Sequence, residues 1–371
     1  MTSSATTKSG SSYLRSADAL VSNRAGLRSF IKEDKMDVSV EPYGQYQGHN
    51  LYELTLTNDQ GMVVKLLNYG ATLEKVLLPE ADGLHNMILS LPSREDYSKE
   101  RNFLGGTVGR IVGRIRGHVW QHGDVKVDLP MNEGKNHIHG GDDGLDRQVY
   151  NFRIDQTATT ASASFTFVDP AGHNGYPGNV KLQVTYTLEN TNTLHYRLDA
   201  VSDEETLFNP TNHTYFAIDQ PNKIDATTLT IPADDYKPLD ADHLPDQGWQ
   251  PVAGTVFDFR QGQKLGDVIH TRAAQITAER GINHPFLLKH GQTLAAKLQT
   301  DKHTMTLATT APSVVVYTAN HFDGTGIPHN IDQFDGVALE CQFAPVSGDD
   351  LSAMTLLPGE PFTLVNSWAF E

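Results

Sequence analysis

Glu340 is an ionisable residue placed where a carboxylate is costly. It lies in segment 337–343, in which alternate residues are apolar. A carboxylate in so apolar a strand is unfavourable unless it is paired or used chemically. Gln342 falls on the same side of an extended chain and adds a second polar group there. We therefore predict a functional rather than a solvated carboxylate. The apolar face of this strand consists of Val337, Leu339, Cys341 and Phe343.

His213 is the second candidate for proton chemistry. It lies in segment 209–216, Asn-Pro-Thr-Asn-His-Thr-Tyr-Phe. If this segment is one strand, His213 shares a face with Thr211 and Tyr215. A half-buried strand histidine bonded to Asn or Thr is the alternative that these residues leave open. Together, a carboxylate and an imidazole form a general base and acid pair near neutral pH, which fits proton transfer at both ends of one bond.

Two glycine-bordered segments contain further polar side chains. Segment 105–115, Gly-Gly-Thr-Val-Gly-Arg-Ile-Val-Gly-Arg-Ile, has neither dinucleotide nor P-loop spacing, so nucleotide binding is not expected. Its arginines are either solvated in a turn or, as with Arg114, available to sugar hydroxyls through the guanidinium fork. His139 precedes two glycines that allow close approach of the backbone to a ligand. An ordinary loop histidine is the alternative.

The elements that position these residues are predicted to be strands. Residues 180–188 alternate between apolar and polar types, and after a Glu-Asn-Thr-Asn turn residues 194–198 do the same, which indicates an antiparallel hairpin. Many strands and few helices predict an all-β fold, a large antiparallel β-sandwich. Helical sequence is confined to short pieces such as 93–98. Further predicted strands cover 63–67, 73–78, 164–168, 227–231, 314–318, 337–343 and 362–370.

Composition narrows the class of protein. The chain has 371 residues, of which 38% are hydrophobic, enough for a large core, and a net charge of −16 that disfavours nucleic-acid binding. Its single cysteine, Cys341, excludes an intrachain disulfide and fits a reducing compartment, so we expect a cytoplasmic protein. No apolar run approaches the roughly 18 residues of a membrane span, so no membrane association is expected.

The N-terminal region differs from the rest. Residues 1–37 are rich in Ser, Thr and Ala. The first 35 of them carry a net positive charge, whereas the remainder of the chain is acidic. This favours a disordered or dispensable tail, although a leader or an upstream start codon would read the same way. Residues 38–371 contain no Pro/Gly/Ser linker, and we predict that they form a single domain.

In its ordered series of short motifs the chain resembles the galactose mutarotase (aldose 1-epimerase) family from about residue 51 to the C-terminus. The resemblance implies a cofactor-free and metal-free β-supersandwich enzyme that interconverts sugar anomers. It implies Glu340 as general base, His213 as general acid, and Arg114, His139, Asn283 and Gln342 as substrate-binding residues. The motifs are 68–71 (NYGA), 108–115 (VGR through RI), 139–141 (HGG), 175–178 (GYPG), 212–216 (NHTYF), 281–286 (GINHPF) and 339–342 (LECQ).

Three positions depart from the family pattern. Gly113 stands where Asn is usual, Asn283 where Asp is usual, and Val315 where Gln is expected. All three normally contact sugar hydroxyls, whereas the proton-transfer residues are intact. The resemblance therefore defines the reaction better than the sugar. Glucose or galactose is the expected substrate, and maltose is the alternative. A monomer and a homodimer both remain open.

Three other classes of protein are alternatives to a sugar epimerase. A non-catalytic carbohydrate-binding sandwich would have no reason to retain both Glu340 and His213. A cupin-like metalloenzyme would use His137, His139, His213 and Glu340 as ligands. A phosphosugar epimerase of the same fold would need an additional cluster of basic residues for the phosphate, and the sequence does not reveal one.

Overall fold

Strands dominate the structure, a computed structural model that describes residues 36–122, 125–245, 247–344 and 351–371. The described residues fall within one compact unit. The tail predicted for residues 1–37 lies almost wholly outside them, with Met36 buried and β1 beginning at Asp37. Among the described residues, no helix is both long and apolar enough to cross a membrane.

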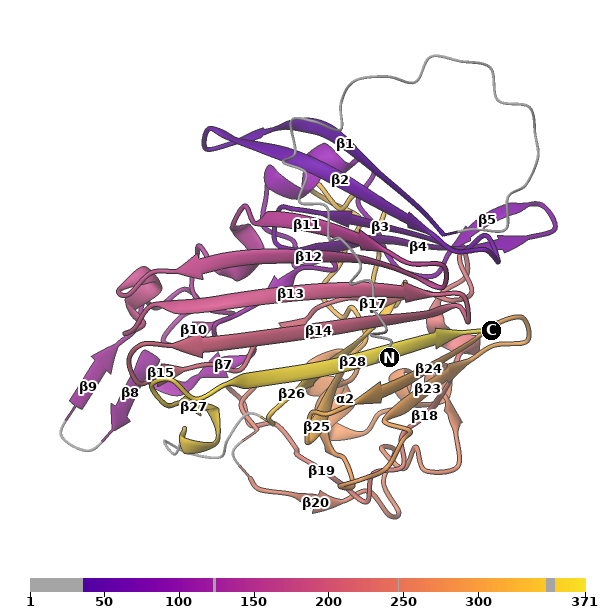
Figure 1. The fold of residues 1–371 in the computed structure, drawn as a ribbon. Helices are drawn as coiled ribbons and strands as arrows, with labels where there is room; N and C mark the ends of the chain where they lie inside the picture. The colour runs from indigo at the N-terminus through magenta and orange to yellow at the C-terminus, as the bar shows by residue number, and fades with distance from the viewer. Residues whose placement is uncertain (1–35, 123–124, 246, 345–350) are drawn as a thin grey trace, which may run out of the picture. The chain divides into compact units, whose positions relative to one another are not determined.

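Three antiparallel sheets form the framework (Figure 1). The five-stranded sheet contains β1 (Asp37–Tyr46), β2 (His49–Thr57), β3 (Val63–Leu67), β4 (Thr72–Glu80) and β5 (Gly83–Asn86), in that order. The nine-stranded sheet contains, from edge to edge, β11 (Asn151–Gln156), β12 (Thr160–Asp169), β13 (Val180–Glu189), β14 (Thr193–Ser202), β28 (Phe362–Phe370), β24 (Thr304–Thr309), β23 (Ala296–Gln299), β18 (Thr228–Thr230) and β21 (Gln263–Lys264). The six-stranded sheet contains β17 (Tyr215–Phe216), β26 (Val337–Gln342), β25 (Ser313–Tyr317), β22 (Asn283–Leu287), β19 (Asp235–Tyr236) and β20 (Gln250–Pro251).

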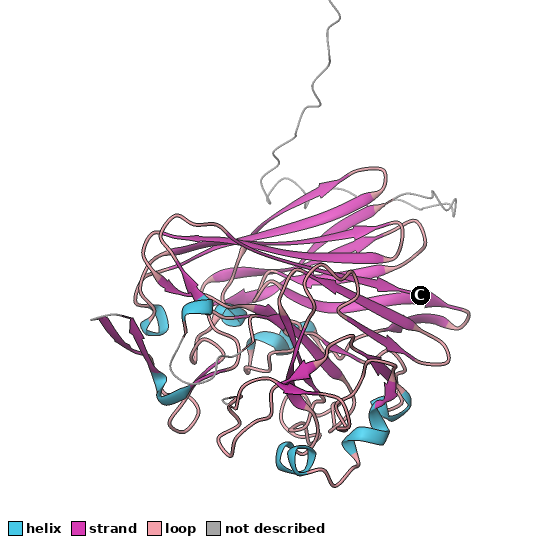
Figure 2. Ribbon diagram, turned by 90° about the horizontal axis from the view of Figure 1, so that it is seen from below, coloured by secondary structure: helices cyan, strands magenta, loops and turns pink. Residues whose placement is uncertain are grey.

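Shorter elements connect these sheets. Figure 2 shows the short helices among the loops, apart from the long strands. The two-stranded pairs are β6 (Thr107–Val108) with β16 (Thr211–Asn212), β7 (Arg114–Ile115) with β10 (His137–Ile138), β8 (Val119–His122) with β9 (Val125–Asp128), and β15 (Thr206–Leu207) with β27 (Thr355–Leu356). The helices are α1 (Leu265–Ile269) and α2 (Ala274–Glu279), with 3₁₀ turns at η2 (Arg94–Ser98), η3 (Arg116–His118), η4 (Leu145–Arg147), η5 (His173–Gly175), η6 (Ile224–Ala226) and η7 (Ser352–Met354).

The predicted all-β antiparallel sandwich is confirmed. Strands β13 and β14 pair as the expected hairpin, with Tyr186 opposite Tyr196, and alternate residues of both strands are buried. The predicted strands 63–67 and 362–370 coincide with β3 and β28. The helical piece expected at 93–98 is the 3₁₀ turn η2. Period-two alternation therefore located β3, β13, β14 and β28 because each has one face in the core.

Two local predictions differ from the structure. Segment 209–216 is not one strand, because β16 pairs with β6 whereas β17 pairs with β26, and His213 lies at the break. Phe343 is not part of the buried face of β26: its side chain is 38% exposed and the strand ends one residue earlier. The Asn209 side chain ends the strand there, since it accepts the Phe343 N–H at 2.9 Å and donates to the Phe343 carbonyl at 3.0 Å.

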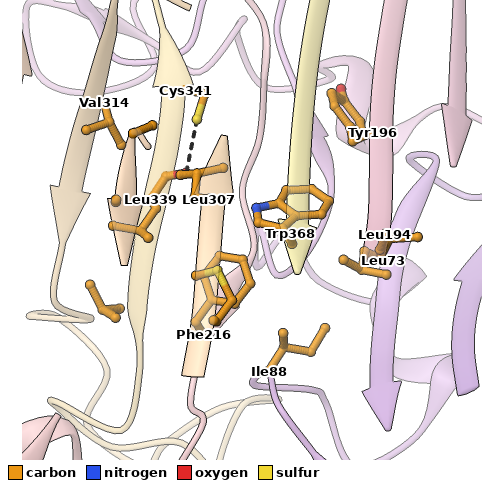
Figure 3. Close-up of a cluster of buried hydrophobic side chains, with 14 of the residues drawn as sticks. Leu73, Ile88, Leu194, Tyr196, Phe216, Leu307, Val314, Leu339, Cys341 and Trp368 are labelled. Carbon is orange, nitrogen blue, oxygen red and sulfur yellow. Dashed lines mark hydrogen bonds between the residues drawn. The ribbon is translucent and has the colours of Figure 1, made fainter. Parts of the chain in front are cut away.

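The core between the nine-stranded and six-stranded sheets determines which way β26 faces. Figure 3 shows Leu339 and Cys341 of β26 in the same apolar cluster as Phe216 and Trp368. All four side chains are almost completely buried. Because successive side chains of a strand point to opposite faces, residue 340 must point away from this core.

A buried arginine joins the glycine-rich segment to the nine-stranded sheet. Arg110 is 1% exposed, and its Nε donates to Asp169 Oδ2 at the end of β12. Its remaining N–H groups donate to Thr206 and to the backbone carbonyls of Asp169, Pro170, Pro177 and Gly178. The sequence suggested that the arginines here were solvated or faced a ligand. Arg110 instead has a structural role, because its guanidinium is fully hydrogen-bonded inside the protein.

Asp169→Asn should lower the free energy of unfolding by about 3–5 kcal/mol, because it leaves the Arg110 charge buried without its counterion. Urea denaturation at neutral pH measures this. The matched control is Asp155→Asn, which removes an exposed ion pair with Arg153 and should change stability by less than about 1 kcal/mol. Equal effects of the two substitutions would refute a special role for the buried pair.

Candidate active site

One face of the six-stranded sheet forms the floor of a cavity of about 660 Å³. The strand register places Pro285, Val315 and Glu340 side by side on β22, β25 and β26. Asn283 lies opposite Tyr317 on the same sheet. The cavity brings together all six predicted site residues, namely Arg114, His139, His213, Asn283, Glu340 and Gln342. Residues distant in sequence thus surround one space.

Glu340 and His213 face each other in this cavity. His213 Nε2 lies 3.4 Å from Glu340 Oε1, and both side chains are less than a tenth exposed. Burial raises the pKa of Glu340 to about 8, an effect that the Arg114 guanidinium and a hydrogen bond from Gln342 only partly oppose. Burial lowers the pKa of His213 to about 4. Both shifts have the same cause, because removal from water disfavours the charged form of each group.

The side chain of Gln342 orients the carboxylate. Its Nε2 donates to Glu340 Oε2 at 3.2 Å, so Oε1 is the oxygen that faces His213. Gln342 Oε1 and His213 Nδ1 are buried and have no hydrogen-bond partner among the residues that the structure describes. Buried polar atoms without partners in a cavity favour a site that is completed by a ligand.

His139 is held with a defined ring nitrogen towards the cavity. The Gly113 N–H donates to His139 Nδ1 at 3.3 Å, so the neutral imidazole carries its proton on Nε2. Burial, with smaller contributions from His213 and Arg101, lowers the pKa of His139 well below its ordinary value. His139 therefore offers an N–H donor. Gly140 is required beside it, because a Cβ there would lie 1.8 Å from the Gly109 carbonyl oxygen.

Arg101, which the sequence analysis did not single out, fastens the loop that carries His139. Its guanidinium forms a bidentate ion pair with Asp146, at 2.8 and 2.7 Å, and donates to the carbonyls of His139 and Gly141. It also lies over the Phe103 ring, which packs 4.7 Å from the His139 ring. This clamp fixes the imidazole while its positive charge further disfavours protonation of His213.

Arg114 enters the cavity from β7. Glu133 accepts two N–H groups of its guanidinium, the one from Nη2 at 2.7 Å, in a bidentate pair. The fork is thereby oriented, and part of the guanidinium remains available to a ligand. Two sequence features anticipated this residue, its position next to Gly113 and its place in motif 108–115.

Asn283 is oriented by a buried carboxylate that the sequence analysis missed. Its Nδ2 donates to Glu279 Oε2 at 3.0 Å, and His243 Nδ1 lies 2.8 Å from Glu279 Oε1. The Glu279 side chain is only 2% exposed. Where the family pattern has a charged Asp, this chain places a neutral amide in the cavity and a carboxylate directly behind it. The position of Glu279 at the end of α2, just before motif 281–286, was the available indication.

The metal set considered from sequence is not brought together. His137 Nδ1 lies 2.7 Å from the Pro130 carbonyl and its Nε2 lies 2.7 Å from Tyr176 Oη, so both ring nitrogens are occupied. His137 is not among the cavity residues. Sequence reasoning also missed three aromatic residues that line the cavity, because no local motif marks them: Phe103, Tyr317 and Phe322.

Several known proteins are similar to this chain in sequence, and a solved structure among them is also similar in fold. A galactose 1-epimerase from Lactobacillus acidophilus NCFM, known as a crystal structure, is 50% identical, with a TM-score of 0.87 over 91% of this chain and 99% of that one. The aldose 1-epimerase of Escherichia coli K12 is 32% identical over 331 residues, covering 85% of this chain and 94% of that protein. A maltose epimerase of Levilactobacillus brevis is 30% identical over 314 residues, covering 84% and 91%.

The sequence profile of the aldose 1-epimerase family matches residues 52–367. This range contains all three sheets except β1, the start of β2 and the end of β28, and it includes every residue of the cavity described above. Because the match spans most of the chain and agrees with the shared fold, this protein belongs to the aldose 1-epimerase family.

Proposed function

We propose that Glu340 and His213 interconvert the α and β anomers of a free aldose by opening and closing its ring. The observation that supports this most strongly is the 3.4 Å approach of His213 Nε2 to Glu340 Oε1 in a buried cavity. Ring opening needs a base at O1 and an acid at O5, and both oxygens are bonded to C1. An acid and a base this close together can therefore serve one anomeric centre.

The proposed reaction balances without an added group. Glu340 removes the proton from the anomeric hydroxyl while His213 protonates the ring oxygen, the C1–O5 bond breaks, and O1 becomes the aldehyde oxygen. Rotation about C1–C2 presents the other face of the carbonyl. The ring closes as His213 takes back the proton from the attacking hydroxyl and Glu340 returns one to O1, which gives the other anomer.

The protonation state of the pair fits this reaction. With a pKa of about 8 for Glu340 and about 4 for His213, the pair holds one proton between these values. The working form, a carboxylate beside an imidazolium, is an isomer of the form with the proton on Glu340. The two forms exchange one proton, so the pair titrates as a unit.

The polar residues around the pair are proposed to bind the sugar. Arg114, His139 and Asn283 offer N–H donors, and the Asn283 amide adds an oxygen acceptor. Gly113 and Val315 offer no polar side chain, so hydroxyls near them lack a side-chain partner. Glucose and galactose are the first candidates. Maltose is the second, supported by the similarity to a maltose epimerase and by these two apolar positions.

We also propose that the protein acts in the cytoplasm, with no requirement for metal or cofactor. The single cysteine, Cys341, is a buried thiol within β26, which suits a reducing compartment. The six proposed site residues supply acid, base and hydroxyl-binding groups from the chain itself.

Glu340→Gln and His213→Asn should each lower kcat by about 10²–10⁴-fold, because each removes one partner of the proton transfer. Polarimetry of freshly dissolved α-glucose, α-galactose and maltose measures the relaxation rate and ranks the sugars. Glu189→Gln, at an exposed surface position, is the control and should retain full activity. If the optical rotation relaxes no faster with wild-type enzyme than without it, the proposal is wrong. A chelator should leave the wild-type activity unchanged.

The dependence of kcat/KM on pH should be bell-shaped, with limbs near pH 4 and pH 8. Below about 4 the pair gains a second proton and Glu340 can no longer act as base, whereas above about 8 it loses its only proton and His213 can no longer act as acid. Initial rates between pH 3.5 and 9.5 test this. A rate that rises steadily above pH 8 would refute the single-proton assignment.

Glu279→Gln should raise KM roughly tenfold with little change in kcat. The neutral amide is a weaker acceptor for the Asn283 N–H than the carboxylate is, and its own N–H must face either Asn283 or His243, so this hydrogen-bond chain is weakened by about 1–1.5 kcal/mol. Steady-state kinetics together with the melting temperature separate two roles. A lower melting temperature with unchanged KM would show that Glu279 is purely structural and does not position Asn283.

A further inference from the structure

Glu80, His85 and His303 converge outside the active-site cavity. Glu80 ends β4, His85 lies in β5, and His303 directly precedes β24, so the cluster joins the five-stranded sheet to the nine-stranded sheet. None of the three lines the active-site cavity. We propose that these three side chains bind one divalent transition-metal ion of the Zn²⁺ type, independently of the epimerase reaction.

The distances within the cluster suit a metal centre. His85 Nδ1 lies 3.3 Å and His303 Nε2 lies 3.2 Å from the same oxygen, Glu80 Oε1. One ligand atom from each residue lies within 4.8 Å of the others. In a tetrahedral zinc site with bonds of 2.0–2.1 Å, neighbouring ligand atoms lie about 3.3 Å apart. The two distances from Glu80 Oε1 to the imidazole nitrogens are therefore already close to the required spacing.

The hydrogen bonding of His303 argues for a cation between these groups. Its Nδ1 lies 2.9 Å from the Ile218 carbonyl oxygen, which can only accept, so Nδ1 carries the proton. In the neutral imidazole Nε2 then has a lone pair, and this lone pair faces a carboxylate oxygen. Two electron-rich atoms at 3.2 Å repel unless a proton or a metal ion lies between them. A backbone carbonyl on the far nitrogen is also the usual partner of a metal-bound histidine.

A buried carboxylate oxygen without a hydrogen bond also supports a metal ion at this cluster. Glu80 Oε1, the oxygen that both imidazoles face, is buried yet makes no hydrogen bond with another described residue. The two imidazole rings are nearly parallel, 5.1 Å apart with 19° between their planes. Two protonated imidazoles stacked in this way would repel each other. A single metal ion held by both rings and the carboxylate satisfies the carboxylate oxygen without placing two cations in contact.

The donor set selects the type of ion. Two imidazole nitrogens and one carboxylate oxygen favour Zn²⁺ and similar transition ions, whereas Mg²⁺ and Ca²⁺ prefer oxygen ligands. Three protein ligands leave one position for water. The side chains of Glu80 and His85 are 25% and 21% exposed, so an ion can reach them. Such an ion would cross-link the β4–β5 hairpin to the turn before β24.

Calorimetric titration of the full-length, chelator-treated protein with Zn²⁺ at pH 7.5 tests the proposal. We expect one equivalent to bind, a rise in melting temperature with zinc, and no comparable response to Mg²⁺. His85→Gln and His303→Gln should each weaken binding by about tenfold or more. His290→Gln removes an exposed histidine elsewhere and should bind like wild type.

Several results would overturn the proposal. Unchanged zinc affinity in both His85→Gln and His303→Gln would place the ion elsewhere, as would loss of binding in His213→Asn. Absence of zinc binding by the wild type would mean that the cluster shares a proton instead. Glu80→Gln provides a third test if either histidine variant fails to fold. The mutarotation rate should not change with zinc, so failure here is distinguishable from failure of the proposed function.

Discussion

The burial of the Glu340 carboxylate is the constraint on which the site depends. Every residue of β26 is buried. One face of the strand packs in the core against Trp368, and the other face forms part of the cavity floor. A carboxylate there loses most of its hydration, which is unfavourable unless the charge is shared with a neighbour. The neighbours of the Glu340 carboxylate are the His213 imidazole and the Gln342 amide. Burial thus makes the Glu340 carboxylate a stronger base and the His213 imidazolium a stronger acid than they are in water, which suits the proposed proton transfer.

The second half of the site depends on tightly fixed loops. Gly140 allows the backbone to pass against Gly109, and Arg101 holds the carbonyls of His139 and Gly141. Arg110 uses its whole guanidinium to bind the same glycine-rich segment to β12 and its following turn. Loops with so many hydrogen bonds from buried cations can present an imidazole as accurately as a strand does. The cavity is therefore preorganised on both sides.

Much of this arrangement could be predicted from sequence because alternation and motif order are local properties. The long hairpin, the polar face of β26 and the six candidate residues that meet in the cavity follow from them. The break at His213 could not be predicted, since it depends on the pairing of β16 and β17 with two different distant strands. Arg110 and Glu279 were missed for a related reason. Charged residues usually lie at the surface, and only the folded chain shows which of them have buried partners.

The residues proposed for proton transfer and those proposed for sugar recognition come from different parts of the structure. The proton pair lies on β26 and on the link between β16 and β17, whereas Arg114 and His139 come from the β7–β10 pair and Asn283 from β22. Val315 lies directly beside Glu340, and its apolar side chain adds to the burial that raises the pKa of the carboxyl group. A polar residue there would contact a sugar hydroxyl but would also solvate the carboxylate. Under the proposed function, differences at 113, 283 and 315 therefore change which sugar is bound, while the proposed acid and base, fixed by the core behind β26, keep the same reaction.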